Sequence, residues 1–183
     1  MGLWTFVKPL IINNFITNDA QIEILNALDS NTFPWYSIKP NDDPNHSAQL
    51  DSVIFKHNDV YAAQYAPLIF PLLTAFEKQL NTKIKRIDRV KCNLLLSRGE
   101  VFINPYHVDS FENKKTLLYY VNDSDGDTVF YNQHYPSSIV TEQQRVKHSQ
   151  GTAVIFDSNQ YHSSSCPVNT KIRLTINCVL EIG

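Results

Sequence analysis

Residues 171–182 have the sequence KIRLTINCVLEI, and this stretch decides the fold because its two faces differ in chemistry. Side chains along a β-strand point alternately to its two faces, so Arg173, Thr175 and Asn177 share one face. The opposite face is wholly apolar, with Leu174, Ile176, Cys178 and Leu180. A buried cation is costly unless it is paired, so Arg173 requires a partner from the protein or from a ligand. The stretch predicts a sheet that is covered by apolar packing outside and faces a polar site inside.

Further strands are predicted where β-branched, aromatic and aliphatic residues gather. These segments are residues 90–97, 116–122, 128–132 and 152–157. Between the second and third, residues 123–127 (DSDGD) predict a turn that closes a hairpin. Gly151, before the fourth, permits a sharp bend.

The N-terminal third is typical of helices and loops. Residues 18–21 (NDAQ) offer an N-cap with Gln three positions later, and apolar residues at helical spacing follow. Residues 60–80 predict a second helical segment, which Pro67 and Pro71 should kink or split. Residues 34–44, rich in Pro, Asn and Asp, predict a loop, and a region extended to residue 50 could act as a lid.

Helices followed by many short strands favour an α+β domain. We expect one domain over residues 1–183, built as a two-sheet β roll with the N-terminal helices packed on the outer face of the major sheet.

Composition favours an ordinary globular protein, with 43% hydrophobic and 19% charged residues. The net charge of −2 gives no global basic field and disfavours a nucleic-acid partner. We interpret the one dense basic run, residues 83–91, as a solvated strand entry. No apolar run approaches membrane-spanning length. Three widely spaced cysteines, Cys92, Cys166 and Cys178, favour a reducing compartment, so a cytoplasmic location is expected.

Two His-x-Asp tripeptides are candidate metal-binding pairs. His57-Asn58-Asp59 precedes every predicted strand, and we interpret Asp59 as a helix N-cap. His107-Val108-Asp109 lies between two predicted strands, where period two would turn His107 and Asp109 to one side and Val108 into packing. Two imidazoles and one carboxylate can cap one face of a non-heme Fe(II) ion and leave the other face open.

The third ligand could come from His134, His148 or His162. His134 and His148 stand in polar, loop-like surroundings, whereas His162 follows the apolar segment 153–156 and precedes the strand of Arg173. Only His162 is placed to approach the His107 pair from across the roll. The same ligands could serve a zinc hydrolase, which we rank lower because the chain has no HExxH motif or dedicated general base.

With these motifs the chain resembles the 2-oxoglutarate- and Fe(II)-dependent oxygenase superfamily, in particular its prolyl 4-hydroxylase-like branch and small phage-type members. The similar motifs stand in the family's order: the opening strand at residues 11–15, the HxD motif at 107–109, a "YYLN"-like strand at 117–122, the segment 151–156 before the distal His162, and the basic-x-Ser/Thr pair at 173–175.

The resemblance implies a double-stranded β-helix (jelly roll) that uses Fe(II), 2-oxoglutarate as co-substrate and O2. It implies three iron ligands, His107, Asp109 and His162. Arg173 would bind the distal carboxylate of 2-oxoglutarate, and Thr175 could add a hydrogen bond. Tyr120 would face inward and reach that carboxylate, while Tyr119 would pack under the helices.

The implied activity is hydroxylation of a C–H bond with release of succinate and CO2. A peptide or protein substrate, with peptidyl proline first, or a small molecule is expected. The chain departs from many prolyl hydroxylases in having Asn104 where they carry Tyr, and residues 94–97 (LLLS) where they often carry another Tyr. Asn93 is the candidate to replace that second Tyr as an inward polar group. Candidate lids are residues 35–36 and 104–106.

Two other classes of function remain alternatives. One is a non-catalytic jelly-roll binding module, which a missing ligand or a missing Arg173 would favour. The other is a cupin-like, metal-dependent isomerase or hydrolase, which would not need Arg173 buried without a protein partner.

Overall fold

The structure is a computed structural model that describes residues 8–38, 47 and 49–183. One set of strands forms the larger sheet: β1 (Leu10–Ile12), β2 (Tyr36–Ile38), β3 (Gln49–Lys56), β4 (Asp59–Val60), β5 (Ile84–Leu96), β6 (Lys115–Tyr120), β9 (Ala153–Asp157) and β11 (Ile172–Ile182). A second set forms the smaller sheet: β7 (Thr128–His134), β8 (Glu142–Val146) and β10 (Gln160–Ser164). The helices are α1 (Asn18–Leu28), the 3-10 helix η1 (Ala63–Leu68) and α2 (Phe70–Leu80).

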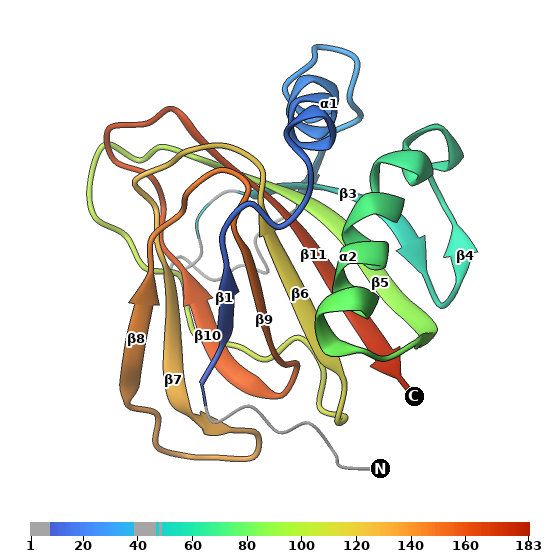
Figure 1. The fold of residues 1–183 in the computed structure, drawn as a ribbon. Helices are drawn as coiled ribbons and strands as arrows, with labels where there is room; N and C mark the ends of the chain where they lie inside the picture. Colours follow the sequence, from blue (N-terminus) through green and yellow to red (C-terminus); the bar gives the residue numbers. More distant parts are fainter. Residues whose placement is uncertain (1–7, 39–46, 48) are drawn as a thin grey trace.

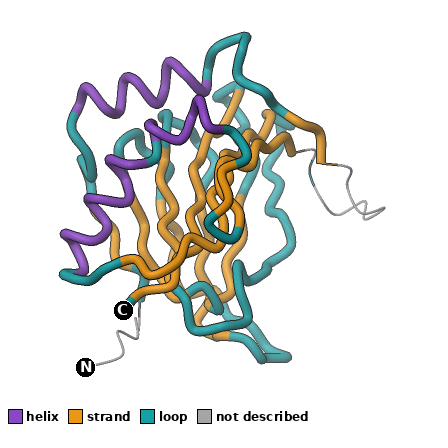
Figure 2. The backbone as a smooth tube through the Cα atoms, turned by 90° about the vertical axis from the view of Figure 1, so that its right-hand side faces the viewer, coloured by secondary structure: helices purple, strands orange, loops and turns teal. Residues whose placement is uncertain are grey.

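The strands form two antiparallel sheets, as predicted for a double-stranded β-helix (Figure 1). The larger sheet has the order β1-β9-β6-β11-β5-β3-β2, with β4 paired to β3, and the smaller sheet has the order β10-β7-β8. The helices gather on one side of the strands (Figure 2). This arrangement confirms the expected α+β jelly roll with helices on the outer face of the major sheet.

Strand β11 lies at the centre of the larger sheet, hydrogen-bonded to β5 on one side and to β6 on the other. Its apolar face is fully buried against the helical layer, where Ile176 belongs to the same core as Ile24 of α1 and Phe76 of α2. Tyr119 joins this core, as predicted. The polar face, beginning with Arg173, turns toward the interior between the two sheets.

The helices follow the sequence signals with one correction. Pro67 lies inside η1, and Pro71 lies in the first turn of α2, so the predicted segment is split as expected. The N-cap of α1 is Thr17, and the Gln21 side chain donates to the carbonyl of Ile16 at 3.0 Å instead of closing a capping box on Asn18. Gln21 is buried, so its amide is satisfied by the nearest free carbonyl.

The interpretation of Asp59 as a helix cap is wrong. His57 and Asn58 have φ angles of 52° and 67° and form a tight turn between β3 and β4, in which Lys56 pairs with Asp59. Two successive left-handed residues are the requirement of a two-residue hairpin. This His-x-Asp tripeptide is therefore at the surface, and strand β3 precedes it.

The predicted hairpin at residues 123–127 is also wrong, because the segment crosses from the larger sheet to the smaller one. The Asp125 carboxylate accepts hydrogen bonds from the backbone N–H groups of Val168, Asn169 and Thr170, at 3.1, 2.7 and 3.2 Å. These bonds tie the crossover to the loop before β11 rather than closing it on itself.

The predicted loop at residues 34–44 contains strand β2, and residues 39–46 lie outside the described residues. Trp35 packs its ring 4.7 Å from that of Phe33 and donates to the carbonyl of Leu28 at 3.3 Å. These contacts place Trp35 in the helical layer rather than over a pocket.

Among the described helices none is long and apolar enough to cross a membrane. The three cysteines are free and buried.

Candidate metal centre and cofactor pocket

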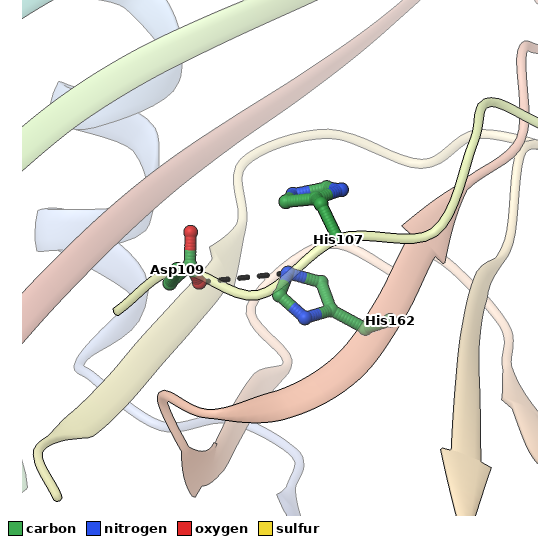
Figure 3. Close-up of side chains that lie close together, drawn as sticks. All are labelled: His107, Asp109 and His162. Atoms are coloured by element: carbon green, nitrogen blue, oxygen red, sulfur yellow. Dashed lines mark ion pairs between the residues drawn. The ribbon is translucent and has the colours of Figure 1, made fainter. Parts of the chain in front are cut away.

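The fold brings His107, Asp109 and His162 together at one end of the space between the sheets (Figure 3). One ligand atom from each residue lies within 4.8 Å of the others. His107 and Asp109 come from the segment between β5 and β6, and His162 comes from β10 of the smaller sheet. Within the described part of the chain this is the one such group of three metal-binding side chains.

A backbone bridge holds the two histidines side by side. The N–H of His107 donates to the carbonyl of His162 at 2.9 Å, and the N–H of His162 donates to the carbonyl of His107 at 3.0 Å. Their ring centroids are 4.5 Å apart. The position of each ligand is thus set by main-chain hydrogen bonds rather than by side-chain rotamers alone.

Each imidazole has its Nδ1 atom next to a carbonyl oxygen. The Nδ1 of His162 is 3.0 Å from the carbonyl of Gln160, and the Nδ1 of His107 is 3.4 Å from that of Pro105. A carbonyl can only accept, so Nδ1 carries the proton and Nε2 keeps its lone pair for a metal. The Nε2 of His162 points to the Asp109 carboxylate at 3.5 Å (Figure 3).

Three side chains fix the Asp109 carboxylate. Arg89 donates to Oδ1 at 2.8 Å, and Thr116 and Asn177 each donate to Oδ2 at 3.0 Å. Burial alone would raise the pKa of Asp109, but electrostatic interactions with the neighbouring His162 and Arg89 hold it below its ordinary value. The carboxylate is therefore ionised at neutral pH.

The His107 imidazole is neutral under the same conditions. Burial, with the neighbouring His162, lowers the pKa of His107 to about 4. Metal ligation needs a neutral imidazole and an ionised carboxylate, which is the state favoured at His107 and Asp109. Two nitrogen donors and one oxygen donor on one side suit Fe(II) with positions left for exogenous ligands, so the residues fit the implied metal.

A cavity of about 190 Å³ extends from this triad between the sheets. From Asn177, beside Asp109, to Arg173 there are four steps along β11, which span roughly 13 Å at ~3.3 Å per residue. The metal triad therefore stands at one end of the cavity, and Arg173 stands at the other. The remaining lining comes mostly from β3, β5 and β10, and includes Gln49, Arg89, Lys91, Asn93, Leu95, Leu118, Thr128, Ser163, Ser164 and Thr175.

Arg173 is 4% exposed, and its hydrogen bonds go to neutral acceptors. Its Nε donates to the carbonyl of Gly126 at 3.0 Å, and its Nη2 donates to Thr128 Oγ1 at 2.8 Å. A Cβ atom at Gly126 would lie 2.9 Å from the Arg173 side chain and 2.6 Å from the carbonyl of Ser165. Gly126 is therefore required for this close approach. A buried guanidinium without a carboxylate partner among the described residues suits an anionic ligand.

Thr128 is a site residue that the sequence did not reveal. Its Oγ1 accepts from the Tyr120 hydroxyl at 2.7 Å and from Arg173, so its own proton is free to point into the cavity. Tyr120 faces the interior as predicted, with its ring 5.8 Å from the Arg173 guanidinium carbon, but its hydroxyl bonds to Thr128. Thr175 lines the cavity, and its hydroxyl is 3.4 Å from the Asn93 amide nitrogen.

Arg89 and Lys91 also line the cavity, contrary to the interpretation of the basic run as a solvated strand entry. Only its first part is exposed, at Lys83, Lys85 and Arg86. The sequence does contain a pattern that indicates the inward position of Arg89 and Lys91. Around Arg89, Lys91 and Asn93 the intervening residues Val90, Cys92 and Leu94 are apolar and buried, the same alternation that marks β11.

His134 and His148, the two other candidates for the third ligand, do not join the cluster of His107, Asp109 and His162. His134 pairs with the carboxylate of Asp157 at 3.6 Å. His148 is buried with its ring stacked 4.2 Å from that of Tyr120.

The fold defines the class of architecture: a double-stranded β-helix with a His-x-Asp pair and a distal His between its sheets. No protein-family model matches the chain, and no curated protein matches its sequence. Solved structures share its fold at low identity. A prolyl hydroxylase from Trichoplax adhaerens, in complex with a hypoxia-inducible-factor oxygen degradation domain peptide, is 16% identical with a TM-score of 0.65, over 94% of this chain and 82% of that one.

Two further structures extend the comparison. A Pseudomonas putida prolyl-4-hydroxylase is 12% identical with a TM-score of 0.61, over 94% of this chain and 92% of that one. The α-ketoglutarate-dependent carbocyclase SnoK from nogalamycin biosynthesis is 9% identical with a TM-score of 0.70, over 94% of this chain and 78% of that one. The chain therefore has the fold of the 2-oxoglutarate-dependent, non-heme iron oxygenases.

Proposed function

We propose that the chain is a 2-oxoglutarate- and Fe(II)-dependent dioxygenase that hydroxylates a C–H bond. The observation that carries the proposal is one cavity with His107, Asp109 and His162 at one end and the buried Arg173 at the other. Arg173 donates its hydrogen bonds to neutral oxygens and forms no ion pair with a carboxylate of the described residues. In the balanced reaction 2-oxoglutarate, O2 and the substrate C–H give succinate, CO2 and the substrate alcohol. Bound Fe(II) would supply the activation of O2 and of the C–H bond.

The protein's own contribution is binding and orientation. Arg173 would bind the distal carboxylate of 2-oxoglutarate in a charge-assisted pair, and the free proton of Thr128 would add a hydrogen bond. Thr175, on the same face of β11, could add another. Tyr120 would act on this carboxylate through Thr128, since its hydroxyl bonds there. Arg89, Thr116 and Asn177 hold Asp109 in position, which preserves the geometry of the metal ligands.

The alternative classes lack a supporting observation. The absence of a candidate metal ligand or of Arg173 would favour a non-catalytic module. His107, Asp109, His162 and Arg173 are all present. A cupin-like isomerase or hydrolase gives no reason to bury Arg173 without an acidic partner.

The substrate is a peptide or protein side chain, with peptidyl proline first, or a small molecule. Support for a peptide comes from the Trichoplax prolyl hydroxylase with its bound peptide. Asn104, at the position where many prolyl hydroxylases have Tyr, donates to Ser164 and accepts from the Ser47 hydroxyl at 2.7 Å. The Asn104 amide is thus bonded within the protein, and the lack of a Tyr at this position leaves the prolyl substrate as one of several candidates.

The test is anaerobic addition of Fe(II) and 2-oxoglutarate, followed by O2. We expect a visible absorption band before O2 and succinate after it, and neither from His107→Ala, whose folding is checked by its thermal transition. A folded wild-type protein that gives no band and does not bind 2-oxoglutarate would contradict the proposal.

A further inference from the structure

A second cationic position lies at the metal end of the cavity, apart from Arg173. Lys91 pairs in register with Asn177, and Asn177 donates to the metal ligand Asp109 at 3.0 Å. Arg173 is four residues away along β11, which is roughly 13 Å at ~3.3 Å per residue. Lys91 is thus beside the metal ligands and far from the group that would bind the distal end of 2-oxoglutarate.

Lys91 lines the cavity between an acidic neighbour, Asp51, and a basic neighbour, Arg89. Its Nζ lies 3.3 Å from the Asp51 carboxylate, and both side chains are about one-fifth exposed, at 21% and 20%. On the same face of β5, Arg89 donates to Asp109. Burial and the nearby charge of Arg89 lower the pKa of Lys91, so an added anion there would relieve an unfavourable charge environment.

The charges of the filled site do not balance without another anion. The lining residues and their ion-pair partners carry three positive charges, on Arg89, Lys91 and Arg173, and two negative charges, on Asp51 and Asp109. Fe(II) and doubly charged 2-oxoglutarate cancel each other. One positive charge remains among these groups. The charge of Asp127 acts on Arg173, at the other end of the cavity, so the excess falls at the metal end, where Lys91 lies.

Building on the proposed function, we infer that the molecule to be hydroxylated carries a carboxylate, which Lys91 binds beside the metal. The carboxylate can belong to a small free acid or to an acidic side chain of a peptide. Lys91 is thereby the residue that determines specificity, and Asp51 occupies it when the substrate is absent. Gln49, which donates to Asn93 at 2.7 Å, supplies a neighbouring amide on the same wall.

The binding test uses protein loaded with Zn(II) and 2-oxoglutarate, so that no turnover occurs. Thermal shift and calorimetry compare each L-amino acid with its primary amide, and end-blocked peptides containing Asp or Glu with the same peptides containing Asn or Gln. At least one acid is expected to bind at least about tenfold more tightly than its uncharged partner, the typical size of a lost charged hydrogen bond. The arm in which this occurs identifies the source of the carboxylate.

Three variants separate recognition by charge from a structural effect. Lys91→Met should lose the preference for the acid while keeping the affinity for 2-oxoglutarate. Asp51→Asn should bind the acid more tightly, because the competing carboxylate is gone. Lys85→Met, at an exposed lysine of the same strand, should behave as the wild type.

The inference is overturned if no acid in either arm is preferred over its uncharged partner, or if Lys91→Met keeps the preference. It is also overturned if Lys91→Met weakens 2-oxoglutarate binding as much as Arg173→Met does, since Lys91 would then bind the co-substrate. The binding of 2-oxoglutarate to the wild type is measured first in the same samples. Its absence would contradict the proposed function, whereas its presence with no acid preference contradicts this inference alone.

Discussion

The main chain of His107 exchanges two hydrogen bonds with that of His162, at 2.9 and 3.0 Å, across an isolated antiparallel bridge. The two residues are far apart in sequence and belong to different parts of the fold. This bridge joins the segment after the larger sheet's β5 to the smaller sheet's β10, so the ligand set exists only when both sheets are in place. Metal binding and folding are therefore expected to be linked.

The first prediction concerns metal-dependent stability. A divalent cation at a hundredfold excess over its Kd adds about 2.7 kcal/mol, which raises Tm by roughly 5 to 10 °C for a protein of this size. His162→Ala should lose most of this gain, because one of three ligands is gone. The matched control is His57→Asn in the other His-x-Asp tripeptide, where Asn tolerates the positive φ of 52°. Equal gains for His162→Ala and wild type, measured by thermal unfolding, would place the metal elsewhere.

The second prediction concerns co-substrate affinity. Arg173→Met should raise the Kd for 2-oxoglutarate by about 10- to 100-fold, because a charge-assisted pair is lost from a buried position. Arg173→Lys should recover part of the affinity, since it keeps the charge but loses the planar fork. Calorimetry with Zn(II)-loaded protein measures both, and exposed Arg145→Met is the control. An unchanged Kd in Arg173→Met would remove the distal carboxylate from this end of the cavity.

The third prediction is a pH dependence of stability from buried His148. Burial, with the charge of Arg173, lowers its pKa well below the ordinary value. The unfolded chain therefore binds a proton near pH 6.5 that the folded protein does not, so the free energy of unfolding falls as pH decreases from 7. By pH 5 one such group costs about 2 kcal/mol.

His148→Phe keeps an aromatic ring against Tyr120 and removes the proton. Between pH 7 and pH 5, the free energy of unfolding of this variant, measured with denaturant, should fall by about 2 kcal/mol less than that of the wild type. The control His57→Asn, at an exposed position, should show the same change in the free energy of unfolding between pH 7 and pH 5 as the wild type. A His148→Phe protein with the same pH slope as the wild type would show that His148 does not titrate differently in the two states.

The fourth prediction concerns the crossover that positions Arg173. Asp125→Ala removes the acceptor for the backbone N–H groups of residues 168–170 and should lower the free energy of unfolding by about 1–2 kcal/mol. The hydrogen bonds from Asn169 and Thr170 hold the pKa of Asp125 below its ordinary value. Its contribution is therefore present at neutral pH and is lost as pH falls through the folded pKa.

Chemical denaturation at pH 7 and at pH 3 measures this effect. The difference between Asp125→Ala and the wild type should be smaller at the lower pH. Glu23→Ala on the exposed face of α1 is the control and should change little at either pH. A loss of stability that is equal at both values would mean that the charge of Asp125 is not what ties the two loops together.

Local alternation and spacing were enough to predict the site's main parts. Residues 171–182 form a strand with two chemically distinct faces. Because alternate side chains share a face, Arg173 lies on the inner, polar face when the apolar face packs against the helices. The same reasoning placed His107 and Asp109 on one side, and the apolar segment before His162 placed that residue opposite. The structure places these side chains as predicted, because each placement depends on a few consecutive residues, and their roles in binding a metal and 2-oxoglutarate stay predictions.

Only the tertiary structure decided the roles of Arg89, Lys91 and Thr128. The alternation of residues 89–94 puts Arg89 and Lys91 on one face of the strand, but charged residues usually face solvent. Only the pairing of β5 with β11, and the helices over the apolar face, turn the charged face toward the cavity. The turn at residues 123–127 has hairpin composition, but the bonds from Asp125 to a distant loop direct it to the other sheet. Hydrogen bonds and strand pairs between distant segments settle such choices, and no local pattern encodes which partner a residue will meet.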